Sequence, residues 1–289
     1  PSVASPRDTG TNETSSPSVA PHIPTPQETL LQQLTPWIVR NNSNDLDYFH
    51  DSSSPQARAL NWLSTDSFVI SEGSPNTTLL ERYVLAVLYF STNGPQWTNN
   101  LNFLTDTSVC TWRSGGAGTI DCGFSASAKG LIQGIALHGI GLAGSIPWEL
   151  SLLAKLEFLN FGSNALTGSI PTELGDLTNV RYLTLRLNNL VGTIPTELAR
   201  LTRLTYLDLH DNSLEGTVPT EFSQLSELTY FSFQRNKLTG SVNNILCSST
   251  KQWQILKSDC LAMNNEIEIE CHCCTVCCNV DGEDCQDNE

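Results

Sequence analysis

Hydrophobic residues between positions 131 and 246 recur with a period of 24 residues. Each unit contains the pattern LxxLxL, in which alternate side chains of a short strand point to opposite faces. In the unit that starts at Leu156, this places Leu159 and Phe161 on the face that turns into the molecule. The units start at Ile132, Leu156, Val180, Leu204 and Leu228. One unit cannot bury its own apolar side, so the period predicts a solenoid of about five stacked coils.

Polar residues and turn formers repeat with the same period. The spacing of 24 residues separates Asn164, Asn188, Asn212 and Asn236, and likewise Pro147, Pro171, Pro195 and Pro219. A side-chain amide can bond backbone groups that a turn leaves unpaired, so we expect the asparagines to form a ladder between coils. Leu166 and Ile170 supply two more inward positions. Ile140 replaces the asparagine in the first unit, and Asn243 replaces the proline in the last, which indicates that the array ends there.

The pattern before the array changes to one of helices. Three helices are expected, over 26–34, 55–64 and 79–93. The first and third open with capping boxes, Thr25 with Glu28 and Thr78 with Glu81, and Gly94 is expected to close the third. These helices predict an N-terminal cap that shields the first coil. Residues 1–24 are rich in Ser, Thr and Pro, and we expect them to form a disordered linker.

The repeat text LxxLxLxxNxLxGxIPxxL resembles the plant-type extracellular leucine-rich repeat. That family includes receptor-kinase ectodomains and polygalacturonase-inhibiting proteins. The resemblance implies an α/β solenoid, a right-handed leucine-rich-repeat superhelix with about five 24-residue repeats. Trp97 and the CTW…IDC motif resemble the family's N-terminal cap, in which the two cysteines pair, here Cys110 with Cys122, and the Trp packs over the first coil.

The C-terminal text ECHCCTVCCNVDGEDC, with SPQARALNWLSTD and NGPQW upstream, is similar to leucine-rich-repeat surface proteins of diatoms and related algae. This resemblance implies a surface protein, and many such proteins carry a membrane anchor upstream of the Ser/Pro-rich region. We expect a helix-like segment between Cys247 and Cys260. The predicted domains are a linker (1–24), a helical N-terminal cap (25–130), the repeat array (131–246) and an acidic, Cys-rich C-terminal cap (247–289).

Charge excludes one class of partner. The 289 residues carry 30 acidic and 15 basic side chains, and the segment 258–289 holds nine acids with neither Lys nor Arg. Nucleic-acid binding needs a basic footprint, so we expect no nucleic-acid partner. The longest apolar run, Tyr83 to Phe90, is too short to span a bilayer.

The ten cysteines avoid the middle of the array. They are Cys110, Cys122, Cys247, Cys260, Cys271, Cys273, Cys274, Cys277, Cys278 and Cys285. This distribution predicts disulfide-bonded caps in an oxidising compartment, and three N-x-S/T acceptors, Asn12, Asn41 and Asn76, agree with an extracellular or cell-surface glycoprotein. The Cys-rich tail with His272 could instead hold zinc. We favour disulfides, with vicinal cysteines bonded to different partners, and predict neither a metal nor a cofactor.

The outward strand positions form columns on the concave side. One column is aromatic, and aromatic side chains with polar handles suit peptide or sugar recognition, although such rings can also simply pack on one another. Strands about 4.8 Å apart give a strip roughly 20–25 Å long. The predicted ligand-binding set is Phe158, Asn160, Tyr182, Arg186, Tyr206, Asp208, His210, Tyr230, Gln234 and Arg235.

His210 lies near Asp208 and Asp211, but no nucleophile sits in a supporting motif, so we predict that the protein is not an enzyme. The favoured hypothesis is an extracellular recognition module that binds a protein, peptide or polysaccharide, as a receptor or adhesion ectodomain does. A competing hypothesis is a structural wall or surface-coat protein in which the solenoid is a spacer. A third, inhibition of a wall-degrading enzyme, rests on fold analogy alone.

Overall fold

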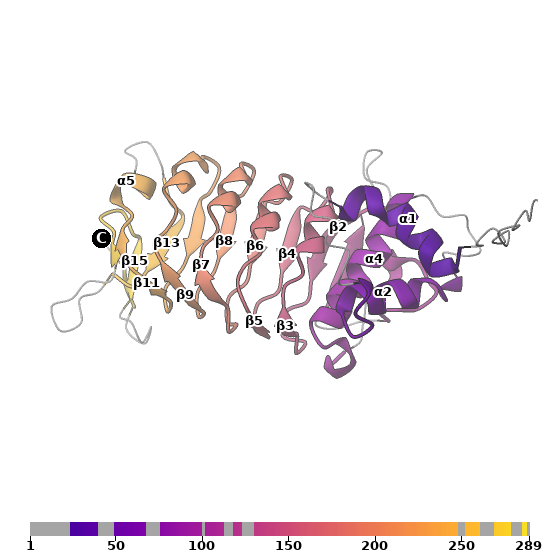
Figure 1. The fold of residues 1–289 in the computed structure, drawn as a ribbon. Coiled ribbons are helices and arrows are strands. Elements are labelled where there is room, and N and C mark those ends of the chain that lie inside the picture. The colour runs from indigo at the N-terminus through magenta and orange to yellow at the C-terminus, as the bar shows by residue number, and fades with distance from the viewer. Residues whose placement is uncertain are drawn as a thin grey trace, which may run out of the picture.

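The computed structural model describes residues 24–39, 49–67, 76–99, 102–112, 118–122, 130–247, 252–260, 269–278 and 285–287. The described chain forms an elongated stack of coils, with helices packed at the N-terminal end and a Cys-rich cap at the other (Figure 1). The predicted solenoid with a helical N-terminal region and a disulfide-rich C-terminal region is therefore confirmed.

Within the described residues, nine strands form one sheet along the array, in the order β1-β2-β4-β6-β8-β10-β13-β15-β16. These strands are β1 (Thr119–Cys122), β2 (Ile132–Ala136), β4 (Phe158–Asn160), β6 (Tyr182–Thr184), β8 (Tyr206–Asp208), β10 (Tyr230–Ser232), β13 (Ile255–Ser258), β15 (Val276–Cys278) and β16 (Cys285–Asp287). From β2 to β15 the pairing is parallel, and Tyr182 pairs with Tyr206 and then Tyr206 with Tyr230, so the register follows the sequence period. The end strands β1 and β16 pair antiparallel.

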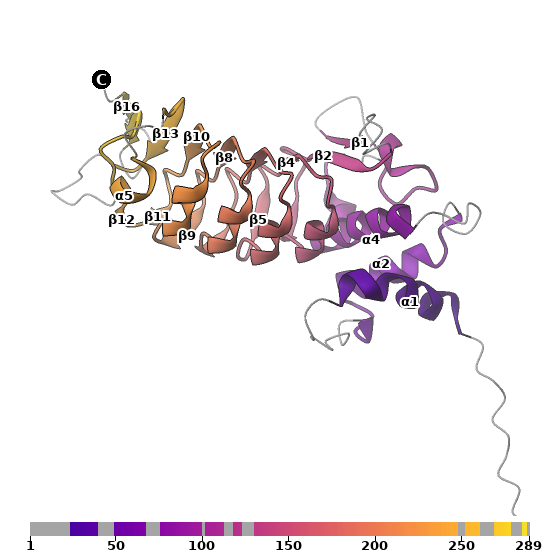
Figure 2. The same ribbon diagram turned by 90° about the horizontal axis from the view of Figure 1, so that it is seen from above.

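The other sides of each coil carry shorter elements. Convex 3-10 helices are η4 (Trp148–Leu152), η5 (Thr172–Asp176), η6 (Thr196–Arg200) and η7 (Thr220–Gln224), and all four follow a Pro at the N-cap. Smaller parallel sheets pair β3 (Ala143–Ser145) with β5 (Ala165–Thr167), join β7 (Val191–Thr193), β9 (Ser213–Gly216) and β11 (Lys237–Leu238), and pair β12 (Gly240–Ser241) with β14 (Ile269–Glu270). Figure 2 shows the main sheet along one side of the array and the smaller sheets along the opposite side.

Between the sheets lies a continuous apolar core. Leu159, Phe161 and Leu166 are fully buried, and Ile170 is nearly so, which confirms the inward positions taken from the period. Ile140, which stands in place of the first asparagine, is also fully buried. Each coil therefore covers the apolar side of the next, as a solenoid requires.

The asparagine ladder is present, and its bonds run between coils. The Asn212 amide oxygen accepts from the Leu190 backbone N at 3.0 Å, and its nitrogen donates to the Leu185 carbonyl at 3.0 Å. Asn188 repeats the pattern one coil earlier, with its oxygen 3.0 Å from the Leu166 backbone N. Because each amide satisfies backbone groups of the preceding coil, the ladder ties neighbouring coils together while the chain turns.

The N-terminal cap contains α1 (Pro26–Ile38), α2 (Pro55–Leu63), α4 (Asn76–Ser91), η2 (Gly94–Gln96) and η3 (Val109–Thr111). The predicted capping box of α1 is confirmed, because the Glu28 backbone N donates to Thr25 Oγ1 at 3.2 Å and the Thr25 N donates to the Glu28 carboxylate at 2.6 Å. The helix continues past Leu34 to Ile38, which is buried and extends its apolar stripe. The predicted start of α2 at Pro55 is confirmed, with Ser54 as its N-cap, and the helix ends at Leu63, one residue before the expected end.

Two predictions for α4 were wrong. The helix begins at Asn76, so Thr78 is inside it and does not cap it. Gly94 does not close it either, because Asn93 takes the left-handed conformation (φ 57°) that ends the turn. Gly94 has a different reason to be glycine: a Cβ there would lie 2.2 Å from the Tyr89 ring.

The C-terminal cap differs from the prediction in one element. The expected helix between Cys247 and Cys260 is wrong, because residues 255–258 form strand β13, which pairs in parallel with β10. Leu256 and Ser258 are buried while Ile255 and Lys257 are half-buried, so the strand alternates between its two faces and covers the open edge of the array. A short helix, α5 (Asn243–Leu246), precedes it.

The predicted disulfide caps are confirmed. Disulfides join Cys110 to Cys122, Cys247 to Cys273, Cys260 to Cys277 and Cys271 to Cys274, and Cys278 is also disulfide-bonded. Vicinal Cys273 and Cys274 have different partners, as predicted. The structure does not describe several predicted features. These are the side chains of Cys285 and Asn76, the residues Asn12 and Asn41, and nearly all of the 1–24 linker. Among the described helices, none is long and apolar enough to cross a membrane.

Candidate ligand-binding face

The aromatic column of the main sheet is a continuous stack of rings. Ring centroids are 4.5 Å apart from Phe158 to Tyr182, 4.2 Å from Tyr182 to Tyr206 and 4.0 Å from Tyr206 to Tyr230, with interplanar angles of 12° to 14°. This aromatic ladder follows from the parallel register, which places equivalent residues side by side. Each ring covers the face of its neighbour, so inside the ladder only the ring edges are left uncovered by other rings. All four side chains are half-buried.

The next column was predicted to face outward, and the structure shows it mostly covered. Thr184, Asp208 and Ser232 are each 1% exposed, whereas Asn160 in an earlier coil is half-buried. Asn160 uses its amide oxygen to accept from the Gly162 backbone N at 3.0 Å. These residues therefore support the face from beneath, and Asp208 does not present its carboxylate to solvent.

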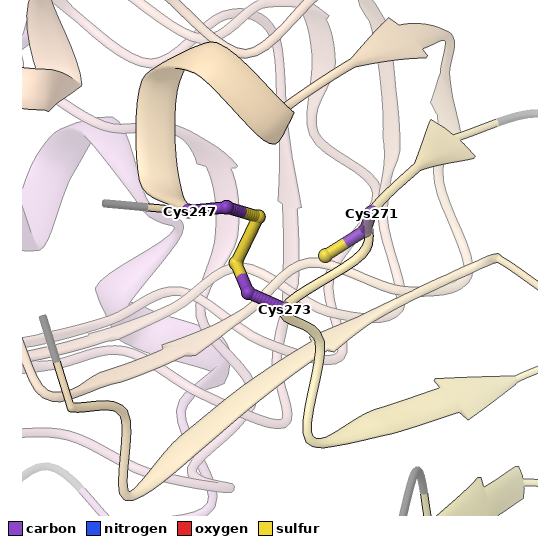
Figure 3. Close-up of side chains that lie close together, drawn as sticks. All are labelled: Cys247, Cys271 and Cys273. Atoms are coloured by element: carbon purple, nitrogen blue, oxygen red, sulfur yellow. A yellow bond between two sulfur atoms is a disulfide. The ribbon is translucent and has the colours of Figure 1, made fainter. Parts of the chain in front are cut away.

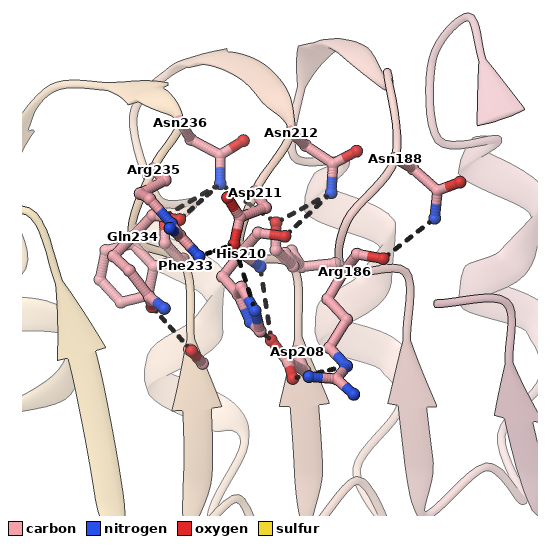
Figure 4. A network of polar contacts seen from close by, with 12 residues as sticks. Arg186, Asn188, Asp208, His210, Asp211, Asn212, Phe233, Gln234, Arg235 and Asn236 are labelled. Carbon is pink, nitrogen blue, oxygen red and sulfur yellow. Dashed lines mark hydrogen bonds and ion pairs between the residues drawn. The ribbon is translucent and has the colours of Figure 1, made fainter. Parts of the chain in front are cut away.

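Asp208 is the centre of a polar network (Figure 4). Its carboxylate accepts from the Tyr206 hydroxyl at 3.2 Å and contacts His210 Nδ1 at 2.5 Å. The Arg186 Nε lies 4.0 Å from the same carboxylate. The buried Asp208 thus fixes one ladder ring and two side chains of the adjoining column. Burial raises the pKa of Tyr206, and a hydrogen bond with Tyr230 adds to the shift, so Tyr206 stays a neutral phenol.

A second carboxylate completes the network. His210 Nε2 lies 3.3 Å from Asp211, so both ring nitrogens of this histidine face a carboxylate. Asp211 also forms an ion pair with Arg235, and the Arg235 backbone N donates to the buried Asp259 at 2.7 Å. A histidine held on both sides by carboxylates is positioned as a structural link between them.

The side chains that reach solvent from this face are few. Arg186 and Leu187 are each 39% exposed and Arg235 is 36% exposed at the side chain. By contrast Gln234, predicted to bind ligand, is only 4% exposed and accepts from the Ser232 hydroxyl at 2.7 Å. Leu187 was not in the predicted set. The sequence feature that could have identified it is an apolar residue at a position that Ser163, Asp211 and Arg235 occupy in other coils.

Leu187 takes a left-handed backbone conformation (φ 54°), as do Ser163, Asp211 and Arg235 in their own coils. This conformation is uncommon for a leucine and turns the side chain out at the end of the strand. The structure thus brings together the aromatic ladder, the network of Asp208, and an exposed edge formed by Arg186, Leu187 and Arg235. We call this surface the ladder face.

Comparisons with known proteins agree with the fold. The family model described as Leucine Rich Repeat matches residues 155–177 and 203–225. No curated protein matches the sequence. The crystal structure of the BIR2 ectodomain from Arabidopsis thaliana is 30% identical, with a TM-score of 0.50 over 58% of this chain and 86% of that one. The BIR3–SERK2 complex from the same plant is 28% identical over 59% of this chain and 89% of that chain, with a TM-score of 0.48.

A third solved structure is the ectodomain of the Arabidopsis thaliana receptor kinase GASSHO1/SCHENGEN3 in complex with CASPARIAN STRIP INTEGRITY FACTOR 2. It is 27% identical, with a TM-score of 0.50 over 63% of this chain, and this chain spans 21% of its length. The resemblance to diatom and algal surface proteins stays a prediction. The repeats and these structures together establish a leucine-rich-repeat fold of the type found in plant receptor ectodomains.

Proposed function

We propose that this chain is a non-enzymatic extracellular recognition module that binds an extended peptide or protein segment on the ladder face. Two observations support the class. Disulfides close both ends of the array, which suits an oxidising extracellular compartment. A plant receptor ectodomain with the same fold is described in complex with a factor that it binds. Neither observation identifies the ligand, which has to be argued from the face itself.

The observation that carries the proposal is the arrangement of the ladder face. A row of aromatic ring edges runs across β4, β6, β8 and β10, and an exposed leucine and two arginines border it. Apolar area beside fixed hydrogen-bond donors is the combination found in binding hot spots, where Tyr and Arg are enriched. At about 3.3 Å per residue, a strip of roughly 20–25 Å accommodates about six or seven residues of extended peptide.

The ladder favours a peptide over a glycan. Recognition of sugar rings by aromatic residues uses the flat face of the ring, and within the ladder each inner ring has its faces covered by its neighbours at 4.0 to 4.5 Å. The ring edges remain, and these can contact apolar side chains and peptide groups. The geometry therefore supports a peptide or protein ligand more strongly than a polysaccharide.

Arg186 is the residue we expect to contribute most. Its Nε faces buried Asp208 at 4.0 Å, which orients the guanidinium without a close ion pair, and its side chain is 39% exposed. A guanidinium has five donors, so most of them are available to carbonyl or carboxylate oxygens of a ligand. Arg235 is more strongly engaged because it pairs with Asp211.

A peptide selection tests the proposal. A displayed library of random peptides would be panned on the immobilised chain and counter-selected on a variant with Tyr182→Ala, Arg186→Ala and Tyr206→Ala. We expect peptides with a shared motif to be enriched on the wild-type chain. If no peptide is enriched more strongly on the wild-type chain than on the variant, recognition at this face is contradicted and the spacer hypothesis is favoured. The hypothesis of a wall-enzyme inhibitor has its own test in direct inhibition assays.

A further inference from the structure

Two disulfides of the C-terminal cap lie next to each other. The sulfur atoms of Cys247, Cys271 and Cys273 all lie within 4.8 Å of one another, although Cys271 is bonded to Cys274 and not to the other two (Figure 3). We call these four residues the cysteine cluster. A sulfur already in a disulfide is not a thiolate ligand, so in this oxidised form the cluster is arranged for sulfur exchange and not for metal binding.

Local hydrogen bonds hold the two bridges side by side. Cys247 follows helix α5 and Cys271 follows strand β14. Asn243, the first residue of α5, accepts a hydrogen bond from the His272 backbone N at 2.7 Å, and its oxygen lies 3.6 Å from the Cys247 sulfur. This residue therefore fixes the loop that carries Cys271 and Cys273 against the helix that carries Cys247.

The bridges differ in access to solvent. Cys247 and Cys273 are half-buried, whereas Cys271 is 8% exposed and Cys274 is 2% exposed. An external thiol therefore reaches the Cys247–Cys273 bridge first. The Cys271–Cys274 bridge is open to attack mainly from inside the protein, by a sulfur that already lies beside it.

Ser258 gives the buried bridge a preferred direction of cleavage. Its hydroxyl oxygen lies 3.3 Å from the Cys274 sulfur, and both side chains are buried. A disulfide sulfur carries no proton, so the hydroxyl is the donor in this contact. A donor at that position stabilises negative charge on Cys274, and the sulfur that is better stabilised as a thiolate is the better leaving group. Attack on Cys271, with Cys274 released, is thus favoured over the reverse.

We propose that the cysteine cluster is a thiol-exchange site for an external thiol, in which the surface bridge relays reduction to the buried one. A thiolate RS⁻ attacks Cys273, forms an RS–Cys273 mixed disulfide and releases the Cys247 thiolate. Cys247 then attacks Cys271, so that the Cys247–Cys271 bond forms, the Cys271–Cys274 bond breaks and the Cys274 thiolate takes a proton.

A second RS⁻ attacks the R sulfur of the mixed disulfide, and RSSR leaves with Cys273 as a thiolate that is then protonated. Two thiols are oxidised to one disulfide, and the protein gains two electrons and two protons. The product has one bridge, Cys247–Cys271, in place of two. Because α5 would then be tied to β14 directly, the exchange would rearrange the end of the array without detaching it.

Peptide mapping of the full chain tests this site. The oxidised protein would be treated briefly with reduced glutathione, quenched with acid, alkylated and digested for mass spectrometry. We expect a Cys247–Cys271 cross-link, with Cys273 and Cys274 alkylated, before the Cys260–Cys277 bridge opens. Loss of the Cys247–Cys273 bridge while Cys271–Cys274 persists would overturn the proposal, as would opening of Cys260–Cys277 at the same rate.

A variant pair tests the role of Ser258. Ser258→Ala is expected to slow formation of the Cys247–Cys271 cross-link about fivefold, the typical contribution of one hydrogen bond. The exposed Ser226→Ala serves as the control and should change the rate less than twofold. An unchanged rate in Ser258→Ala, with the wild-type bridges formed before reduction, would show that this hydroxyl does not direct the cleavage.

Discussion

The repeat array and its N-terminal cap bury polar groups in different ways. In the array the same amide recurs in four consecutive coils, and each of these asparagines bonds backbone groups of the coil before it. In the cap a single arginine, Arg82, satisfies buried polar groups through contacts that are not repeated. Arg82 is fully buried and forms an ion pair with Asp66. It also donates to the carbonyls of Thr105 and Thr107 at 2.7 and 2.5 Å. Its guanidinium also lies 5.1 Å from each of the Trp62 and Trp112 rings.

The difference shows what periodicity accomplishes. A coil in the middle of the stack meets a copy of itself on both sides, so one small set of contacts can be repeated. A cap meets the array on one side only and needs contacts that occur once, such as a buried ion pair or a disulfide. The C-terminal cap solves the same problem with covalent bonds. The repeated part thus supplies a regular face for binding, while the ends carry chemistry of their own.

The largest expected effect is in the array core. Leu207 is fully buried, and Leu207→Asp would place an unpaired charge there, so we expect a loss of about 5 kcal/mol in the free energy of unfolding. Denaturant unfolding followed by circular dichroism measures it. The matched control is Leu187→Asp at an exposed position, which should change stability by less than about 0.5 kcal/mol. Equal stability of the two variants would mean that the repeat register is wrong.

In the N-terminal cap, substitution of Arg82 should destabilise the fold almost as much. Arg82→Met would leave Asp66 buried without its ion-pair partner, and we expect a cost of about 4 kcal/mol. Combining it with Asp66→Asn removes the stranded charge, so the double variant should recover part of the loss. Both variants are measured by the same unfolding curves. If Arg82→Met is as stable as the double variant, the ion pair does not organise the cap.

The junction between cap and array should respond to pH. Glu81 accepts from the Ile132 backbone N at 2.8 Å and Glu149 accepts from Gln56 at 2.7 Å, and burial raises the pKa of both carboxyls to about 7. The unfolded chain releases these protons near the ordinary value of about 4.5, so the folded state binds more protons between these limits. Stability should therefore fall as the pH rises from about 4.5 through about 7, by about 3 kcal/mol for each carboxyl.

Unfolding curves at several pH values measure this dependence. Glu81→Gln and Glu149→Gln keep the accepting oxygen and remove the titration, so the double variant should show a flatter profile in this window. If the wild-type chain gains stability relative to the double variant between about pH 4.5 and about pH 7, the raised pKa values of Glu81 and Glu149 are contradicted.

The asparagine ladder should give the smallest of these effects per residue. Asn212→Ala removes the acceptor of the Leu190 N–H and the donor to the Leu185 carbonyl, and unsatisfied backbone groups should cost about 2 kcal/mol. Asn189→Ala, at an exposed neighbouring position, is the control and should be nearly neutral in the same thermal or denaturant melts. Equal effects at the two positions would show that the ladder does not tie the coils together.

Sequence reasoning reached most of the array because its signal is repeated. The inward positions, the asparagine ladder and the aromatic column all follow from one period, and stacking in parallel register brings them into line. Segments outside the repeats were harder to predict. Residues 255–258 have no repeat to identify them, and they become a strand because the open edge of β10 pairs with them. Disulfide connectivity likewise depends on distances that the sequence does not contain.

The candidate site was predicted in outline and corrected in detail. Alternation along a strand indicated that Asp208 faces outward, but it could not show that the ladder and the adjoining column cover it. Gln234 is buried for the same reason. Leu187 was missed because the predicted set holds only aromatic and polar residues, and it includes Arg235 at the equivalent left-handed position. Burial on the concave side depends on neighbours 24 residues away, which a single unit does not reveal.

The most direct test of the ladder face is calorimetric titration of a selected peptide against three forms of the chain. These are the wild type, Arg186→Ala on the ladder face, and Arg200→Ala on the convex side, where Arg200 pairs with Asp176 at 3.3 Å and is 60% exposed. We expect Arg186→Ala to weaken binding at least about tenfold, as loss of a hot-spot arginine does, and Arg200→Ala to leave the affinity within about twofold of wild type. Equal affinities for the wild type and Arg186→Ala, or a larger loss in Arg200→Ala, would contradict recognition at the ladder face.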